Sequence, residues 1–97
     1  MFVILVTYTK PLEEIDKALV AHRAFLKSQY DAGLFLASGP QNPRTGGVIL
    51  AQAADRAALE AVLATDPFRV QGVADYTVIE FQPLMTDDRL AFLRAQS

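Results

Sequence analysis

The order of apolar and polar positions along the chain alternates between the period of a strand and that of a helix. Residues 2–8 (FVILVTY) are apolar on both alternations and rich in β-branched side chains, which indicates a central strand covered on both faces. The next segment predicts a helix that begins near Pro11, with Thr9 as a candidate cap, and ends near Gly33. Its apolar stripe has helical spacing and comprises Leu12, Ile15, Leu19, His22 and Leu26.

Three more strands and two more helices are predicted after this helix. A turn-rich connection separates the first two strands, and all three are expected at residues 34–38, 48–52 and 76–81. Asp55 is the expected cap of a helix over residues 56–65, whose buried face comprises Ala58, Leu59, Val62 and Leu63. A last amphipathic helix is expected at about residues 86–95, with Thr86 as its cap.

The resulting order, β-α-β-β-α-β, predicts the α+β class and a ferredoxin-like antiparallel sheet in a single domain over residues 1–97. Right-handed crossovers place both helices on one face of the sheet. The other face has no element of its own to cover it, although residues 2–8 are apolar on both alternations. A large exposed apolar face is unusual for a soluble monomer. We therefore expect two sheets to pack face to face in a homodimer, as a dimeric α+β barrel, with the C-terminal helix reaching across.

Composition and charge limit the classes of partner. The chain has 97 residues, 52% of them hydrophobic, and a net charge of −2 at pH 7. Its basic residues are scattered, whereas nucleic-acid-binding proteins gather them in a stripe, so no nucleic-acid partner is expected. The longest apolar run is much shorter than the roughly 20 residues of a membrane span, and it lacks the flanks of a signal peptide. A cytoplasmic protein with no membrane partner is expected.

The chain contains no cysteine and a single histidine. Disulfides, thiolate nucleophiles, zinc–thiolate sites and multi-histidine metal sites within one chain are therefore not expected. No cluster of acidic residues suggests a magnesium site, and no glycine-rich loop has the spacing of a nucleotide phosphate site. The expectation is a site without a metal.

His22 lies in the middle of the apolar stripe of the first helix. On a helical wheel it falls within about 40° of Ile15, which places it on the side that faces the sheet. One interpretation is a core histidine that bonds a backbone carbonyl. The other is a general acid or base at the floor of a cleft. An imidazole in the second role usually needs a carboxylate that orients it and stabilises its charged form.

Asp66 is the leading candidate for that carboxylate. Because Pro67 follows it, Asp66 is also a standard cap for a short helical turn through residues 68–70. The two roles are compatible, since one carboxylate oxygen can cap the turn while the other faces the cleft. Asp75, at the start of the last strand, is the alternative acid and is more typical of a turn residue.

Five further residues are candidates for substrate binding. Ser38 and Gly39 follow the second strand, where a hydroxyl and free backbone N–H groups can line the mouth of a cleft. Arg44 lies in the turn-rich loop and Arg69 follows Asp66-Pro67, and either guanidinium can meet an anionic substrate. Tyr76 lies on the last strand, where a phenol combines an apolar body with a polar tip. Ordinary turn, surface and core roles are the alternatives for all five.

These residues give the chain a resemblance to a known family. It resembles the YciI-like (YCII-related) proteins, small members of the dimeric α+β barrel superfamily, over nearly its whole length. The likeness rests on the hydrophobic first strand and on a histidine in the middle of the first helix (Ala21-His22-Arg23). It also rests on residues 36–40 (LASGP) and on Asp66-Pro67-Phe68 before the last strand. No single motif is specific, but their order and spacing together are distinctive.

The resemblance implies a ferredoxin-like homodimer with a His–Asp pair in a cleft, which corresponds to His22 and Asp66, with Ser38 as a neighbour. The clearest activity associated with such proteins is dehydrochlorination of a chlorinated hydroxyhydroquinone without a metal or an organic cofactor. The resemblance therefore implies a cofactor-free lyase that converts a small hydroxylated aromatic or quinol to a hydroxybenzoquinone and releases chloride. A muconolactone-type isomerase that uses the same pair, and a non-catalytic small-molecule-binding dimer, are the alternatives.

Overall fold

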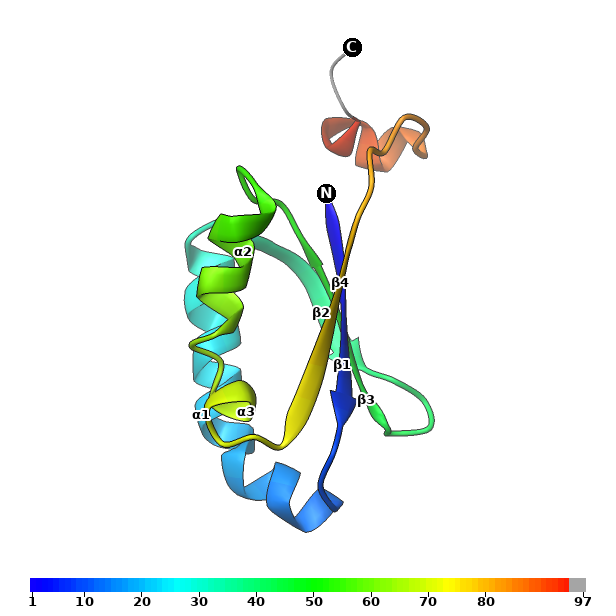
Figure 1. Cartoon of the computed structure of the whole chain (residues 1–97). Coiled ribbons are helices and arrows are strands. Elements are labelled where there is room, and N and C mark those ends of the chain that lie inside the picture. Colours follow the sequence, from blue (N-terminus) through cyan, green and yellow to red (C-terminus); the bar gives the residue numbers. More distant parts are fainter. Residues whose placement is uncertain (95–97) are drawn as a thin grey trace.

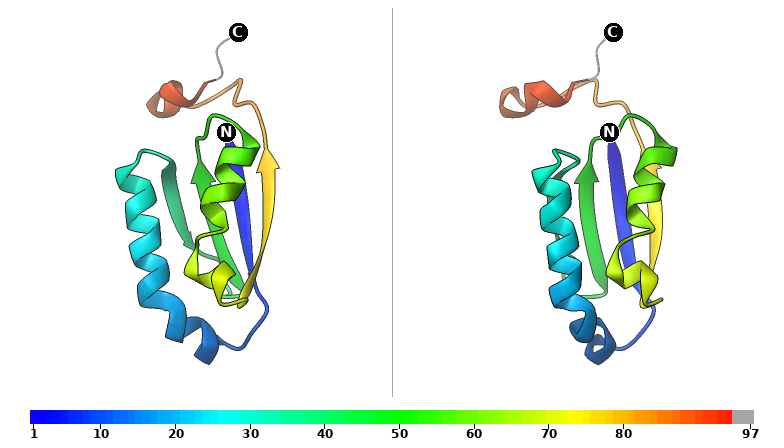
Figure 2. Two further views of the ribbon diagram at one scale, coloured as in Figure 1. Left: turned by 60° about the vertical axis from the view of Figure 1, so that its left-hand side comes forward. Right: turned by 90° about the vertical axis from the view of Figure 1, so that its left-hand side faces the viewer.

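The structure, a computed structural model that describes residues 1–94, is a four-stranded antiparallel sheet with its α-helices on one face (Figure 1). The strands are β1 (Phe2–Tyr8), β2 (Phe35–Pro40), β3 (Gly46–Ala51) and β4 (Ala74–Glu80). The helices are α1 (Leu12–Asp31), α2 (Arg56–Leu63) and α3 (Pro67–Val70), followed by the 3-10 helix η1 (Asp88–Leu93). Figure 2 shows α1 and α2 side by side over the sheet, with α3 at the end of α2. No helix among residues 1–94 is long and apolar enough to cross a membrane.

The strand order β2-β3-β1-β4, with every neighbouring pair antiparallel, confirms the predicted ferredoxin-like α+β fold. β1 is central because it pairs with β3 on one side and with β4 on the other. The side chains of β1 alternate between the two faces, as a strand requires. Those on the helix side are buried, and the core that they join includes Phe2, Ile4, Val6, Ile15, Phe25, Phe35, Leu59, Leu63 and Phe68.

The buried stripe of α1 is rotated relative to the predicted one. Its buried residues are Ile15, Ala18 and Phe25, whereas Leu19 and Leu26 are only partly buried. The rotation is roughly 65° about the helix axis, as the helical wheel gives it. Its cause is a cavity between α1 and the sheet, since Leu19 and Leu26 line this cavity instead of packing against the strands.

Two glycines that suggested a turn belong to a strand. β3 begins at Gly46, two residues before the expected start, and Gly46 and Gly47 pair with Thr7 and Val6 of β1. A Cβ atom on Gly46 would lie 1.8 Å from the carbonyl oxygen of Val6, so the close approach of the two backbones requires glycine here. β4 likewise begins at Ala74, before the expected residue 76.

The helices differ from the prediction in their caps, in their ends and in one residue of a buried face. Thr9 caps nothing in α1, which begins after Pro11 without a side-chain cap. α2 ends at Leu63, two residues before the predicted end, and Ala58 on its predicted buried face is exposed. In place of the C-terminal helix expected over residues 86–95 there is the shorter η1. Asp87 caps η1 instead of Thr86, and Ala95 lies outside the described residues.

Candidate active site

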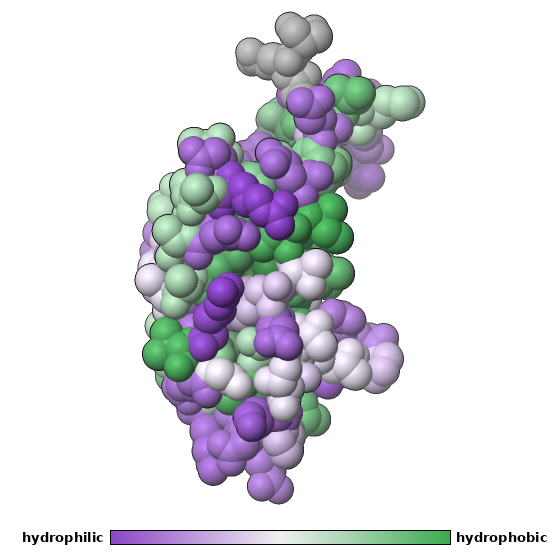
Figure 3. All heavy atoms as spheres, viewed as in Figure 1, coloured by the Kyte–Doolittle hydropathy of each residue, from purple (hydrophilic) through white to green (hydrophobic). Residues whose placement is uncertain are grey.

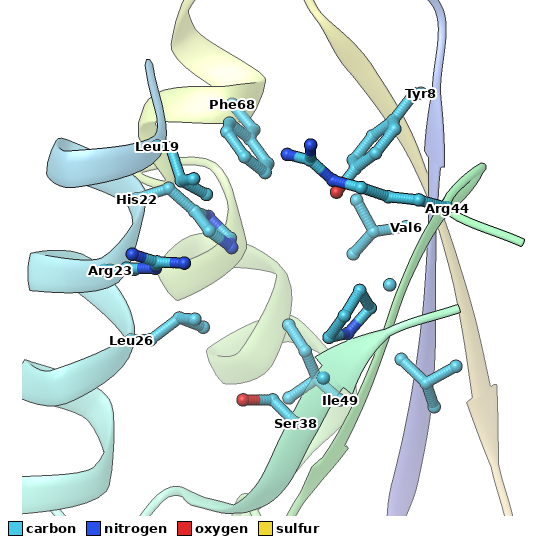
Figure 4. Close-up of a pocket in the computed structure, with 14 residues that line it drawn as sticks. Val6, Tyr8, Leu19, His22, Arg23, Leu26, Ser38, Arg44, Ile49 and Phe68 are labelled. Carbon is cyan, nitrogen blue, oxygen red and sulfur yellow. The ribbon is translucent and has the colours of Figure 1, made fainter. Parts of the chain in front are cut away.

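A cavity of about 370 Å³ lies between α1 and the sheet, and it is formed within one chain (Figure 4). One wall is the face of α1 that carries His22 and Arg23. The opposite wall is formed by β2, β3 and the loop that carries Arg44. Phe68 of α3 closes a third side. The lining is largely apolar with a few convergent polar groups, which is the usual character of a small-molecule site.

Asp66 is the one charged side chain in the buried core of the described residues, with an exposed fraction of 0%. It caps α3, since its Oδ1 accepts a hydrogen bond of 3.0 Å from the N–H of Phe68, and Pro67 occupies the first turn. The sequence pattern Asp-Pro therefore fixes the carboxylate at the start of the helix, beneath α1. A buried carboxylate is stable only when its oxygens are hydrogen-bonded, and Asp66 has three donors around it.

His22 is one of these donors. Its Nδ1 lies 2.8 Å from Oδ1 of Asp66, and only 12% of the histidine side chain is exposed. An ionised carboxylate can only accept, so this bond places the imidazole proton on Nδ1. Nε2 is then the nitrogen whose lone pair is free on the side of the cavity. This arrangement can take up a proton at Nε2, and Asp66 stabilises the resulting imidazolium.

Phe68 packs against one face of the His22 imidazole. The rings of His22 and Phe68 are stacked, with centroids 3.8 Å apart and planes 6° from parallel. Phe68 is itself buried and meets the ring of Tyr8 edge-on at 5.9 Å. The orientation of His22 is thus fixed by a hydrogen bond along the ring plane and by an aromatic contact across it.

Tyr76 supplies the third hydrogen bond to Asp66. Its hydroxyl donates to Oδ2 at 2.5 Å, from β4 on the side of Asp66 that faces away from His22. Burial, followed by this hydrogen bond, raises the pKa of the Tyr76 phenol above its usual value. The phenol therefore remains a donor in the physiological pH range. Tyr76, predicted from the sequence as a substrate-binding residue, is not among the residues that line the cavity, and its hydroxyl instead contacts the carboxylate of Asp66.

Ser38, on the wall formed by the sheet, hydrogen-bonds to a second hydroxyl group. The Oγ of Ser38 on β2 lies 2.6 Å from the hydroxyl of Tyr30 at the end of α1. Ser38 and Gly39 both line the cavity, as the sequence predicted for a cleft mouth. Figure 4 shows Ser38 on the side of the cavity opposite Phe68, with His22 between these two residues. Ser38 therefore shares the cavity lining with His22, whereas Tyr30 does not line the cavity.

Arg44 reaches the cavity from the loop between β2 and β3. The loop is tied to β1, since the N–H of Tyr8 donates to the carbonyl of Thr45 at 3.0 Å. The guanidinium of Arg44 donates to Asp16 of α1 at 2.7 Å and lies over the Tyr8 ring, 6.0 Å from its centroid. The hydrogen bond to Asp16 raises the pKa of Arg44. Arg44 therefore connects the loop to α1 across the mouth of the cavity.

The structure brings together most, but not all, of the predicted site residues. Arg69 lies outside the cavity, where its guanidinium lies over the ring of Tyr76 at 5.6 Å. Asp75, the alternative acid, is exposed on β4. Sequence reasoning missed Arg23, which lies next to His22 in the chain and also lines the cavity. Residues 1–94 contain no group of three or more acidic or histidine side chains placed to hold a metal ion.

Comparison with known proteins identifies the family. A model of the YCII-related domain matches residues 1–82, which is most of the chain. The chain belongs to the YCII-related family. No match was found among curated protein sequences.

Two solved structures share the fold of this family member. One is the 5-chloro-2-hydroxyhydroquinone dehydrochlorinase from Burkholderia phenoliruptrix in complex with 2,5-dihydroxybenzoquinone. It is 18% identical, with a TM-score of 0.70 over 84% of this chain and 94% of that chain. The other is described as an antibiotic biosynthesis monooxygenase, 26% identical, with a TM-score of 0.54 over 84% of this chain and 98% of that chain. Both likenesses agree with the ferredoxin-like α+β fold, and the first neighbour is an enzyme that binds a small molecule.

Proposed function

We propose that the protein is a cofactor-free lyase in which His22 and Asp66 act as a general acid/base dyad on a small hydroxylated aromatic or quinol. The observation that carries the proposal is the 2.8 Å contact between Nδ1 of His22 and the buried Oδ1 of Asp66 at the wall of a ring-sized cavity. The most concrete reaction is dehydrochlorination of a chlorinated hydroxyhydroquinone to a hydroxybenzoquinone. Membership of the YCII-related family and the fold shared with a dehydrochlorinase support this choice.

In the proposed reaction a hydroxyl proton of the quinol first moves to the carbon that carries chlorine, which gives the keto tautomer. Nε2 of His22 then takes the proton of a remaining ring hydroxyl of this tautomer. The released electron pair shifts through the ring and expels chloride from that carbon, so that the net loss is one proton and one chloride ion. The imidazolium, held against Asp66, then returns its proton to water. General acid–base catalysis of this kind contributes roughly 10²- to 10⁴-fold to the rate. Ser38 and Gly39 are proposed to bind ring oxygens, because they line the same cavity.

A second copy of the chain is proposed to cover the open face of the sheet. Val3 and Leu5 of β1 point to this face, as do Val48 and Leu50 of β3, and Ile79 of β4 is 47% exposed. Figure 3 shows hydrophobic residues on the side of the sheet that faces away from the helices. The expected assembly is a homodimer with the two sheets face to face. Size-exclusion chromatography with light scattering tests it, and a monomer at micromolar concentration contradicts it.

The catalytic proposal is tested by chloride release from 5-chloro-2-hydroxyhydroquinone under anaerobic conditions. His22→Ala is expected to lower the rate about 100-fold or more, because it removes the base. Asp66→Asn is expected to lower it as well, because a neutral amide no longer stabilises the imidazolium. Asp75→Asn is the matched control, since it neutralises an exposed carboxylate that does not line the cavity. Circular dichroism shows whether each variant is folded.

The outcomes separate the proposed lyase from its alternatives. Unchanged chloride release in folded His22→Ala refutes the dyad mechanism. A His22-dependent product of the same mass as its substrate, with no halide released, indicates a muconolactone-type isomerase. Ligand binding that survives in His22→Gln, without turnover of any quinol by the wild type, indicates a non-catalytic binding protein.

A further inference from the structure

Arg23 of α1 follows His22 in the chain and lines the same cavity, while its side chain remains exposed (Figure 4). The ion pairs found among residues 1–94 involve other cations, and none of them includes Arg23. A guanidinium with five N–H donors thus belongs to the cavity lining and has no carboxylate partner among the described residues.

The charges around the cavity do not balance. Its lining contains two guanidinium groups, those of Arg23 and Arg44, and no carboxylate. Arg44 is paired with Asp16, which does not line the cavity. Asp66 lies behind the imidazole of His22 and is bonded to three donors. The uncompensated charge on the cavity wall is therefore the positive charge of Arg23.

A positive charge in this place suits the chemistry of a base such as His22, and the inference rests on the function proposed above. When His22 removes a proton, the imidazolium is stabilised by Asp66 on one side, and the substrate gains negative charge on the other. A guanidinium binds an oxyanion through two parallel hydrogen bonds, and such charge-assisted bonds are stronger than neutral ones. Arg23 lies on the same wall as His22, so it can contact oxygens of a ring that His22 deprotonates.

We propose that Arg23 binds an oxyanion of the substrate, so that the cavity selects small rings that carry an ionised oxygen substituent, either a carboxylate or an acidic ring hydroxyl. Arg44, held by Asp16, forms the opposite side of the entrance. Arg23 thereby determines substrate specificity, while the His22–Asp66 pair moves the proton. Neutral rings of the same size fit the apolar walls but lack this contact.

Binding of matched ligands tests the proposal. The probes are 4-hydroxybenzoate and 4-hydroxybenzamide, which differ in charge at one substituent, and 2,5-dihydroxybenzoquinone, whose ring hydroxyls are ionised at neutral pH. Their dissociation constants are measured by NMR titration of the wild type, of Arg23→Gln and of Arg23→Lys. Arg89→Gln is the control, because it removes the same charge from an exposed side chain outside the cavity.

The wild type is expected to prefer the anionic probes. Arg23→Gln is expected to weaken binding of at least one anionic probe about 10-fold or more and to leave the benzamide unchanged. Arg23→Lys retains part of the preference, and Arg89→Gln retains all of it. An effect on hydroxybenzoate alone identifies a carboxylate ligand, and an effect on the quinone alone identifies an acidic hydroxyl.

Three results overturn the proposal. The first is equal affinity of the wild type for charged and neutral probes, and the second is no binding of either anion at millimolar concentration. The third is equal weakening of all probes in Arg23→Gln, which means that Arg23 only shapes the cavity. Because this experiment measures binding, it succeeds or fails independently of chloride release by the His22 dyad.

Discussion

The imidazole of His22 lies flat on the phenyl ring of Phe68, with the ring centroids 3.8 Å apart. Phe68 is the second residue of the short helix that Asp66 caps, and its N–H donates to the same oxygen that accepts from His22. One turn of helix therefore presents both the carboxylate and the aromatic surface to the histidine. Local helix capping and the geometry of the candidate site are determined by the same atoms.

Truncation of Phe68 should be costly for stability. Phe68→Ala removes a buried ring from the core and leaves a cavity beneath His22, which should lower the free energy of unfolding by about 3–5 kcal/mol. Urea denaturation measures this loss. Phe92→Ala is the matched control, because Phe92 is 69% exposed on η1, and its effect should lie within about 0.5 kcal/mol. Equal effects of the two substitutions would contradict the packing described here.

Tyr76→Phe should change the pH dependence of stability. Burial, together with the bond to Asp66, raises the pKa of Tyr76 in the folded state. Above about pH 10 the unfolded chain loses the phenolic proton while the folded chain keeps it, so the folded state binds more protons. This group therefore lowers the wild-type free energy of unfolding by about 1.4 kcal/mol per pH unit in that range. Tyr76→Phe has no phenolic proton, so this pH-dependent contribution to the free energy of unfolding is absent.

The wild type and Tyr76→Phe should therefore differ in stability by an amount that depends on pH. Near pH 8 the wild type should be more stable than Tyr76→Phe by about 1.5–3 kcal/mol, the usual contribution of a hydrogen bond to a charged group. Above about pH 10 the advantage should shrink as pH rises. Urea denaturation at a series of pH values measures the difference. A difference that stays constant up to about pH 11 would refute the raised pKa.

Two of the aspartate caps, Asp55 and Asp66, should respond differently to substitution. Asp55 is exposed and accepts only the N–H of Ala58, at 2.7 Å, so Asp55→Ala should cost about 1 kcal/mol and leave activity unchanged. Asp66→Ala leaves one buried donor and two partly buried donors without an acceptor, and should cost about 3–5 kcal/mol. Thermal and urea denaturation of both variants gives the comparison. Similar losses would show that Asp66 acts as a cap alone.

Gly46→Ala should destabilise the protein by forcing β3 away from β1. A methyl group at this position meets the carbonyl oxygen of Val6 at 1.8 Å, and backbone atoms in the middle of a sheet cannot move aside cheaply. The expected loss is about 1–3 kcal/mol, as for other overpacked sites. Gly39→Ala is the control, since nothing lies within 4 Å of a Cβ atom there. Equal stability of the two variants would contradict the close contact.

The sequence predicts the fold well because hydrophobic periodicity controls it. β1 is found at its predicted residues, and the short turn after Asp66-Pro67 forms as local capping rules require. The errors at β3 have a physical reason. Gly46 and Gly47 have the composition of a turn, but the close approach of β1 draws them into the sheet. Such an approach depends on tertiary contacts that local sequence does not encode.

The candidate site was predictable only in part for a similar reason. The position of His22 on the buried side of α1 and the Asp-Pro cap are local signals, and both residues could be named from them. The contact of Tyr76 with Asp66 and the place of Arg23 in the cavity depend on how β4 and α1 pack. A helical wheel puts Arg23 about 100° from His22, which suggests solvent until the cavity beside α1 is known.

The cavity has a rigid wall and an adaptable one. Asp66 binds three donors in the core, whereas on the facing side Ser38 makes one hydroxyl contact and Arg44 one exposed ion pair. Arg23, on the wall formed by α1, is exposed and belongs to none of the ion pairs found among residues 1–94. Substitutions at positions 23, 38 and 44 should therefore be tolerated by the fold far better than changes at Asp66. A small combinatorial library at these three positions would sample new ligands around an unchanged His22–Asp66 pair, which makes this chain a practical scaffold for laboratory evolution.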